Sequence, residues 1–307
     1  MKRLLYAPLD LLMHMMALLP FWVLYGISDC LFLLVYYVVR YRRKVAVKHI
    51  SDSFPELSAA EHRRITRRFY RNFTDYIVET IKLLHISDKT IRRRMTFDNV
   101  ELMDSLMAEG RQVMALFSHS GNWEWAPSVT LWSRFTPGVD AEFGQVYRPL
   151  NNRWFDRYML RLRSRFGSVS YPIRGVLRDL LKVRRSGLYS VTGFMSDQKP
   201  RYGDVKHVID FLNHRTATLT GSEDLARKLG MAVIYWDMEK PRRGHYHITM
   251  RLVARDAAAT PEFEITDTYF RMLETTIRRN PPIWLWTHKR WKYPTAFNPD
   301  GMPVAES

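Results

Sequence analysis

The sequence predicts an α/β protein in which a mixed, mostly parallel central sheet is flanked by helices and preceded by an N-terminal membrane-anchoring helix. Two observations carry this prediction. After about residue 95, apolar runs of strand length alternate with amphipathic stretches of helical length, as in helices packed on a sheet. Before residue 40 the chain is far more apolar than elsewhere. The composition, 46% hydrophobic and 25% charged over 307 residues, excludes wholesale disorder.

The first apolar run covers 11–28, eighteen residues without a formal charge at pH 7. This is just long enough for a membrane span, which needs roughly 17–25 predominantly apolar residues. Asp29 separates it from a second apolar run at 30–39, so we expect one embedded helix followed by a shorter interfacial continuation. A cleavable signal peptide fits poorly, because the run is longer than a signal-peptide core and no small-residue cleavage site accompanies it.

A buried helical hairpin of a soluble protein is the alternative interpretation of residues 1–40. Four tyrosines favour a membrane, because tyrosine is enriched where helices meet the bilayer surface. They are Tyr25, Tyr36, Tyr37 and Tyr41. The basic residues after the apolar runs outnumber Lys2 and Arg3 before them, which favours a cytoplasmic main domain. These following residues are Arg40, Arg42, Arg43, Lys44 and Lys48.

The chain as a whole is strongly basic, with 47 Lys and Arg against 31 Asp and Glu and a formal net charge of +16. Nucleic acid, an anionic membrane and an acidic protein are the usual partners of such a charge. We expect no nucleic-acid partner, because the arginines of 161–165 are interleaved with apolar residues at helical spacing and no recognition motif accompanies them. The single cysteine, Cys30, excludes a disulfide scaffold and a four-thiolate metal site.

Residues 41–95 are predicted to be helical and to link the anchor, 1–40, to an α/β domain, 96–307. Ser58 to Glu61 forms a capping-box pattern at the start of a helix. Apolar residues then recur at helical spacing from Ile65 to Thr80, and arginines occupy the other face. This arginine face is either simply solvated or a docking face for anionic lipid or an acidic carrier protein.

In the α/β domain, five apolar runs are predicted as strands and three amphipathic stretches as helices. The predicted strands are 113–117, 141–147, 188–194, 231–238 and 245–253, the last two joined by a hairpin at 240–244. The predicted helices are 151–166, 219–229 and 266–279, ended by Gly167, by Gly230 and by Pro281 and Pro282.

The densest polar cluster, 118–124, follows the first of these strands directly, where α/β proteins place their sites. His119 and Glu124 are five residues apart, which is about 140° around a regular helix, so they would not touch on one. A turn at Gly121 brings them within reach, and a histidine oriented by a carboxylate takes a proton from a hydroxyl. A purely structural histidine is the alternative.

This His-x4-Glu pattern resembles that of glycerolipid-type acyltransferases, and further segments resemble the late, or secondary, acyltransferases of lipid A biosynthesis. They occur in that family's order from about residue 45 to 292. The segments are 45–56 with Ser53-Phe-Pro-Glu56, Tyr147-Arg148-Pro149 with Asn151 and Asn152, Ser196-Asp197-Gln198, 216–221, and 277–292 with Trp284-Leu-Trp286-Thr-His288.

The resemblance implies transfer of a fatty acyl group from a thioester, usually on acyl carrier protein, to a hydroxyl of a membrane lipid, without a cofactor. It implies His119 as general base and Glu124 as its orienting carboxylate. Arg148 would hold an anionic group or the developing oxyanion. Asn151, Asp197, Gln198 and Arg290 are the other candidate substrate-binding residues, although Lys199 replaces an acidic residue frequent in the family and Arg290 suits a structural ion pair equally well.

Three alternatives stay open. His245 and His247 on one strand face are a possible metal-ligand pair, although we expect no metal. The chain could be a non-enzymatic basic membrane protein. The acceptor could be another lipid, namely an amino-acid lipid, a lysophospholipid or a glycosylated phosphatidylinositol. With the lipid A precursor as acceptor, the resemblance places the chain at the bacterial inner membrane, with its catalytic domain facing the cytoplasm.

Overall fold

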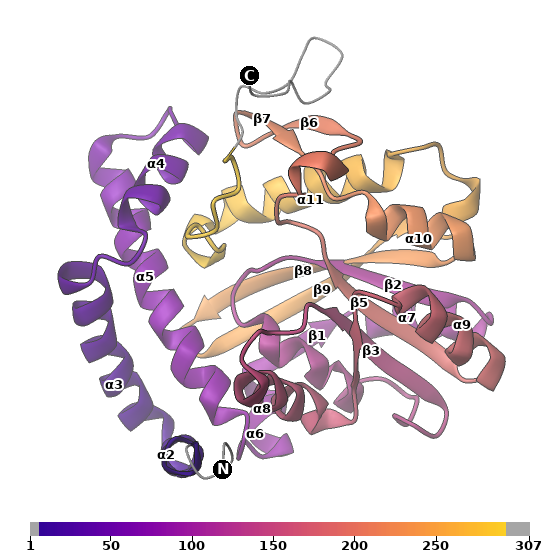
Figure 1. Ribbon diagram of the computed structural model, residues 1–307, viewed down its shortest axis with the longest axis horizontal. Helices are drawn as coiled ribbons and strands as arrows, with labels where there is room; N and C mark the ends of the chain where they lie inside the picture. Colours follow the sequence, from indigo (N-terminus) through magenta and orange to yellow (C-terminus); the bar gives the residue numbers. More distant parts are fainter. Residues whose placement is uncertain (1–5, 293–307) are drawn as a thin grey trace.

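The computed structural model describes residues 6–292, apart from the side chain of Tyr202. A seven-stranded sheet with the order β1-β9-β8-β2-β5-β3-β4 forms its centre, and β6 and β7 form a separate hairpin (Figure 1). The strands are β1 (Met95–Asp98), β2 (Gln112–Phe117), β3 (Ala141–Tyr147), β4 (Val169–Pro172), β5 (Tyr189–Met195), β6 (Val208–Phe211), β7 (His214–Ala217), β8 (Ala232–Arg242) and β9 (His245–Ala254). Only β8 and β9 pair antiparallel within the large sheet, so the predicted mixed, mostly parallel α/β fold is confirmed.

Helices cover both faces of the sheet. They are α2 (Ala7–Leu18), α3 (Phe21–Leu33), the π-helical turn η1 (Leu34–Val38), α4 (Arg43–Ser53), α5 (Ala59–Lys82), α6 (Asp88–Arg94), α7 (Val100–Ala108), α8 (Arg153–Arg163), α9 (Val176–Ser186), α10 (Gly221–Leu229) and α11 (Glu264–Arg279). Short 3₁₀ segments are η2 (Trp123–Leu131), η3 (Ser164–Phe166), η4 (Tyr202–Asp204), η5 (Ala257–Ala259) and η6 (Pro281–Ile283).

Alternate residues of the buried strands enter two separate cores. Met114 and Leu116 of β2 belong to a cluster with residues of α4, α5, α9, α10 and α11. Val113, Ala115 and Phe117 belong to a cluster with residues of α6, α7, η2 and α8. This division follows from the period of two along a strand, and it explains why β2 is buried over its whole length. The predicted strand at 113–117 is therefore confirmed, with one more residue at its start.

The helix α5 begins as predicted. The side chain of Ser58 accepts a hydrogen bond from the Glu61 N–H, and the Glu61 side chain accepts one from the Ser58 N–H. Residues of α5 share a core with the sheet, so the helical segment is packed onto the α/β domain. The division of the chain at residues 40 and 95 stays a prediction.

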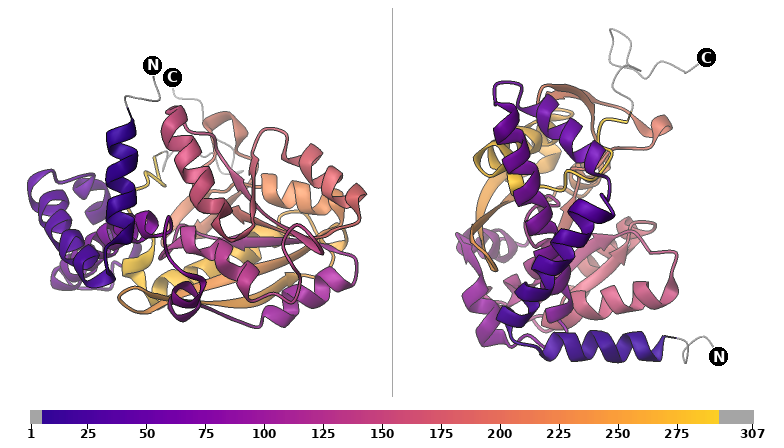
Figure 2. Two further views of the ribbon diagram at one scale, coloured as in Figure 1. Left: turned by 90° about the horizontal axis from the view of Figure 1, so that it is seen from below. Right: turned by 90° about the vertical axis from the view of Figure 1, so that its left-hand side faces the viewer.

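The N-terminal segment is folded differently from its prediction. The apolar run 11–28 is not one helix: α2 ends at Leu18, and Pro20, which favours an extended conformation before the next turn, precedes α3. The 18 residues Phe21–Val38 instead form the one helix among the described residues that is long and apolar enough to cross a membrane. α3 lies along α5, and α2 runs across the end of α3 (Figure 2).

Candidate active site

The candidate site lies at the carboxyl ends of two neighbouring parallel strands, β2 and β5. Phe117 at the end of β2 pairs with Met195 at the end of β5, so the residues two positions beyond each strand come side by side. The chain leaves β2 toward β3 and leaves β5 toward β8, in opposite directions across the sheet. The first connection contains η2 and the second α10, which pack on opposite faces of the sheet. Connections that leave neighbouring strands for opposite faces open the crevice in which α/β proteins bind their ligands.

His119 follows β2, and its ring is held by Asp197, which follows β5. The Nδ1 atom of His119 lies 2.7 Å from Oδ1 of Asp197, and the His119 backbone N–H donates to Oδ2 at 3.0 Å. A carboxylate that accepts the Nδ1 proton leaves Nε2 as the basic nitrogen. The expectation that Glu124 orients His119 is therefore corrected. Strand register brings Asp197 to the ring, whereas Glu124 points elsewhere.

Asp197 is only 2% exposed. Trp284 also contacts it, donating from Nε1 to Oδ2 at 3.0 Å. Burial by itself would raise the pKa of Asp197, but the charge and hydrogen bonds of His119 and the bond from Trp284 outweigh burial and lower the pKa below its ordinary value. The carboxylate is thus ionised at neutral pH. Asp197 therefore holds His119, and its role in binding substrate stays a prediction.

Arg290 is also buried, with 3% of its surface exposed, and its Nη2 donates to the Ala217 carbonyl at 2.7 Å. Burial lowers the pKa of Arg290 to about 10, while the charge of Asp197 acts in the opposite direction. The guanidinium therefore stays charged at neutral pH and balances the buried carboxylate. Burial of Arg290 favours the structural alternative, and its role in binding substrate stays a prediction.

Glu124 forms a buried ion pair of its own. Arg163 Nε donates to Oε2 at 2.8 Å and Arg163 Nη2 to Oε1 at 2.7 Å, so both carboxylate oxygens are occupied by one guanidinium. A bidentate pair of this kind fixes the relative orientation of the two side chains and also neutralises their charges. The pair joins η2, which follows the His119 loop, to the end of α8. Glu124 therefore positions α8 and, through it, the loop that precedes this helix.

The loop between β2 and η2 is held from both sides. Gly121 has a φ of +59°, and a Cβ there would lie 2.6 Å from Sδ of Met238, so this position requires glycine. Its N–H donates to the Ile283 carbonyl at 2.9 Å, and Ser120 pairs with Trp284. The C-terminal segment, which the sequence singled out as a motif, thus fixes the backbone that carries His119.

The basic nitrogen of His119 faces a partly open edge, and 16% of the side chain is exposed. The amide of Gln198 lies 3.2 Å from Nε2 and donates to it, so the predicted site residue Gln198 does meet His119. Trp123 packs edge-on against the ring at 5.1 Å and stacks on Tyr76 of α5 at 4.2 Å. A hydroxyl that replaces the Gln198 amide would reach Nε2 beside an aromatic wall.

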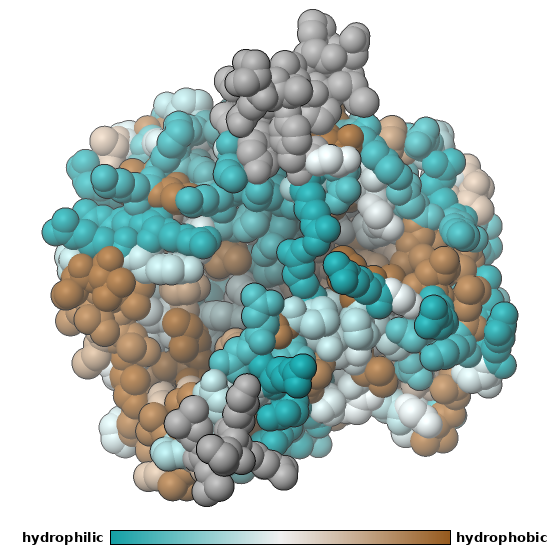
Figure 3. Space-filling view, in the orientation of Figure 1, coloured by the Kyte–Doolittle hydropathy of each residue, from teal (hydrophilic) through white to brown (hydrophobic). Residues whose placement is uncertain are grey.

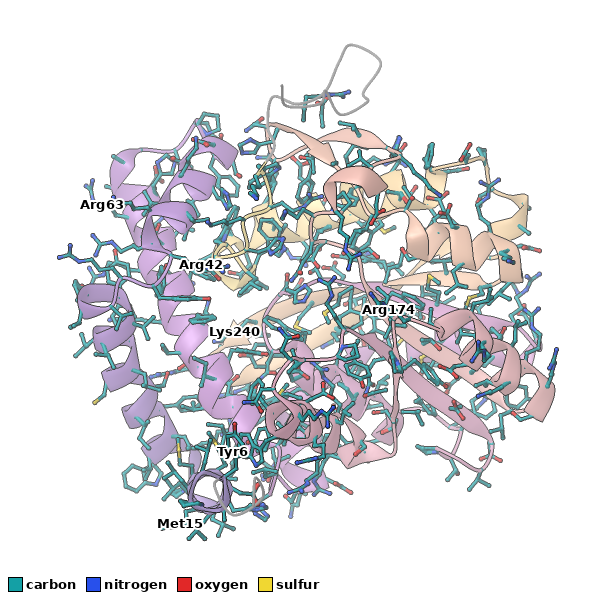
Figure 4. The ribbon with its side chains drawn as sticks, in the orientation of Figure 1. Tyr6, Met15, Arg42, Arg63, Arg174 and Lys240 are labelled. Atoms are coloured by element: carbon teal, nitrogen blue, oxygen red, sulfur yellow. The ribbon has the colours of Figure 1, made fainter. Side chains whose placement is uncertain are left out.

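Arg148 and Asn151 lie at the same edge of the sheet, in the exposed loop after β3. Their side chains have no hydrogen-bond partner within residues 6–292, and β5 separates their strand from β2. Arg174, which follows β4, is likewise exposed (Figure 4). Its neighbour Ile173 lies beside the end of β3, because the Ile173 N–H donates to the Tyr147 carbonyl at 2.9 Å. Arg174 was not predicted as a candidate, because β4 is too short for its sequence to indicate a strand.

Comparison with known proteins identifies the protein family of this chain. Residues 9–293 match the family described as bacterial lipid A biosynthesis acyltransferase. The chain belongs to this family. It is 25% identical over 291 residues to the lipid A biosynthesis lauroyltransferase of Escherichia coli K12, covering 93% of this chain and 89% of that protein. It is 23% identical over 253 residues to the palmitoleoyltransferase of the same organism and to a lipid A biosynthesis acyltransferase of Shigella flexneri, covering 82% of this chain and 79% of each.

The family resemblance read from the sequence is therefore confirmed, and the chain is an acyltransferase of lipid A biosynthesis. The matched residues include most of α2, all of α3 and all the candidate site residues.

The described part of this lipid A acyltransferase has no group of three or more His, Cys, Asp or Glu side chains placed to hold a metal ion. The two histidines considered as ligands have separate partners. His247 Nδ1 lies 2.8 Å from the Thr96 hydroxyl, and His245 Nδ1 lies 3.1 Å from the Arg243 carbonyl. The metal-site alternative thus has no support in residues 6–292.

Two histidines that pack the C-terminal segment of the acyltransferase give it a pH-dependent stability. Burial lowers the pKa of both His49 and His288 to about 4. The unfolded chain binds these protons near pH 6.5 and the folded chain only near pH 4, so the free energy of unfolding falls as pH decreases through this window. We expect a loss of about 3 kcal/mol per histidine. Denaturant titration at pH 7 and at pH 4 measures this difference in the free energy of unfolding. His49→Gln should reduce the difference by about half. Equal stability of the native protein at the two pH values would contradict the expectation.

Proposed function

We propose that this chain moves a fatty acyl group from the thioester of acyl carrier protein to a hydroxyl of a lipid A precursor, with His119 as the general base. The reaction would take place at the cytoplasmic face of the bacterial inner membrane. The observation that carries the proposal is the His119–Asp197 pair, a histidine with an ionised carboxylate on Nδ1 at the carboxyl end of a buried strand. Family membership supports both the reaction and the acceptor.

In the proposed step, Nε2 of His119 takes the proton of the acceptor hydroxyl as its oxygen attacks the thioester carbonyl. The tetrahedral intermediate then collapses, the C–S bond breaks, and the thiolate of the carrier takes the proton back from Nε2. An ester and a free thiol result, so no proton is gained or lost overall. Asp197 stabilises the imidazolium that forms between these two proton transfers.

The other polar residues are assigned according to what they contact. Gln198 occupies Nε2 in the resting enzyme and is displaced by the hydroxyl. Glu124 acts through Arg163 as a positioning residue. Arg148 and Asn151, exposed and unpartnered within residues 6–292, are the groups we assign to an anionic part of the substrate.

The charge of the surface supports an acidic donor. The exposed face of α5 carries Arg63, Arg64, Arg67 and Arg68, and the whole chain has a net charge of +16. Acyl carrier protein is acidic, and a basic face would raise its association rate in a salt-dependent manner. Coenzyme A, also anionic, is the competing donor.

The direct test is an acyl-transfer assay with the full-length protein in detergent. Acyl carrier protein and coenzyme A thioesters of the same acyl chain are compared, each with a lipid A precursor and with a lysophospholipid. We expect transfer to the lipid A precursor, faster from the carrier protein, and none with His119→Ala. Preference for the lysophospholipid would replace the acceptor, and turnover by His119→Ala near that of the native protein would refute the mechanism.

Arg148→Ala is expected to lower kcat/KM by about 10- to 100-fold, because a charge-assisted hydrogen bond to an anionic group is worth roughly 1.5–3 kcal/mol. The thermal midpoint should stay unchanged, since the side chain has no partner in the described chain. Steady-state kinetics with varied acceptor measures the effect. Arg185→Ala is the matched control, an exposed arginine near the end of α9. Loss of folded protein in Arg148→Ala alone would indicate a structural arginine.

A further inference from the structure

The first two helices expose large apolar side chains to solvent. On α2 they include Leu11, Met15 and Leu18, and on α3 with η1 they include Trp22, Leu33 and Leu34. We refer to these six residues as the apolar plate. Trp22 is 78% exposed and Leu18 67%, so these side chains point away from the protein. In the space-filling view a hydrophobic area lies at the lower left, over α2 and α3 (Figure 3).

Charged groups are bound to α3 at its centre, and one of them lies on the exposed face, because Asp29 is seven residues from Trp22 and four from Leu33. Asp29 accepts two hydrogen bonds from Arg243, at 2.8 and 3.1 Å. Ser28 donates to the buried carboxylate of Asp75 at 2.8 Å, and Arg243 bonds to that carboxylate as well. Tyr25 donates to Glu79 at 3.1 Å. The tip of the β8–β9 hairpin and α5 therefore hold the middle of the apolar helix through carboxyl groups and an arginine.

Charges also line both ends of the same helix. The guanidinium of Arg94 lies 3.6 Å from the ring centroid of Phe21, at the first residue of α3. At the far end, Arg43 lies over the ring of Tyr36 at 4.8 Å. Charged groups thus accompany α3 from its first turn to its last. If α3 crossed a bilayer in this packing, these groups would enter the hydrocarbon with it, and each ionised side chain there is costly.

The other helix cannot complete a transmembrane hairpin. α2 has 12 residues and is about 18 Å long at 1.5 Å per residue, against a hydrocarbon thickness of roughly 30 Å. Instead, α2 crosses the end of α3 so that both helices border one side of the molecule (Figure 2). Met15 of α2 points outward on this side (Figure 4).

Basic groups border the plate. Arg63 projects outward beyond the end of α3, whereas Arg42 points inward and donates to the Thr287 carbonyl at 3.2 Å (Figure 4). A groove of about 540 Å³ begins at Leu33 of the plate and is lined by Arg68, Arg71 and Arg242 among others. An apolar surface edged by cations matches one leaflet of an anionic bilayer, in which acyl chains lie beneath a layer of phosphates.

We infer that α2 and α3 lie flat in the cytoplasmic leaflet of an anionic membrane instead of crossing the membrane. The inference rests on the proposed membrane location and adds the orientation of α2 and α3 relative to the membrane plane. It places the catalytic domain directly on the surface from which a lipid acceptor is taken. The residues at both ends of α3 then stay at one depth, which distinguishes this arrangement from a membrane span.

Spin-label depth in vesicles tests the inference with the native Cys30, which is exposed in α3. Trp22→Cys and Val38→Cys, each with Cys30→Ala, place single labels at the two ends of the helix, about 24 Å apart along it. Collision with oxygen and with a water-soluble nickel chelate gives the depth of each label in phosphatidylethanolamine–phosphatidylglycerol vesicles. Val139→Cys with Cys30→Ala is the control, an exposed apolar position before β3.

We expect the labels at 22, 30 and 38 to share a depth of roughly 5–10 Å and the label at 139 to stay in water. Replacing phosphatidylglycerol with phosphatidylcholine should weaken vesicle binding, with the loss largest at low salt. A deep label at 30 flanked by labels at opposite surfaces would overturn the inference, and so would an absence of vesicle binding. Because the measurement uses no turnover, its failure would leave the acyl-transfer proposal untouched.

Discussion

Asp197→Asn is expected to lower kcat by about 10²- to 10⁴-fold while most of the fold is retained. The reason lies in the donors around the carboxylate. Two N–H groups, from the His119 backbone and the Trp284 ring, point at Oδ2. The amide oxygen of asparagine must face these donors, which turns its NH₂ group toward Nδ1 of His119. The ring then carries its proton on Nε2, and a protonated Nε2 cannot accept the proton of the acceptor hydroxyl.

Acyl-transfer kinetics and a thermal melt on the same preparation separate this effect from a structural one. Asp210→Asn is the matched control, because Asp210 is a surface carboxylate whose side chain is 81% exposed, and it should retain native activity. Glu124→Gln should differ from both by lowering the thermal midpoint, since it leaves Arg163 without its charge partner. If Asp197→Asn were less stable but fully active per folded molecule, Asp197 would only support the structure.

The site shows what local sequence can and cannot predict. The strand before His119 was predictable because six consecutive buried residues leave a clear apolar signal. The partner of His119 was not, because it is 78 residues away and is brought there by the pairing of β2 with β5. Glu124, five residues away, was the natural choice from spacing alone. The useful signal was that His119 and Asp197 each follow a buried strand by the same number of residues.

The short strands were missed for a related reason. β1 and β4 have four residues each, and four residues carry too little periodicity to predict a strand. Their strand conformation comes from pairing with β9 and β3 in the assembled sheet. The N-terminal helix break at Pro20 was readable from the sequence, yet hydropathy alone extended the predicted helix from 11 to 28 across it.

The second large effect concerns stability. Asp75→Ala is expected to destabilise the protein by about 3 kcal/mol, because it removes the shared acceptor of a buried ionic network. Asp75 is 2% exposed and bonds to Ser28 of α3, to Lys240 and to Arg243. Lys240, only 6% exposed at its side chain, keeps Asn72 as a neutral partner but loses its countercharge. A melt in detergent should show a midpoint lower by roughly 5–10 °C.

Asp210→Ala is the control for this variant. It removes the exposed ion pair between Asp210 and Arg215, and such pairs contribute about 0–1 kcal/mol. A midpoint for Asp75→Ala as close to native as that of the control would contradict the prediction. It would also mean that the hairpin tip and α5 do not hold α3 through this carboxylate. The expected large difference follows from burial, since a charge left without its partner in the interior keeps its full desolvation cost, whereas one at the surface recovers that cost from water.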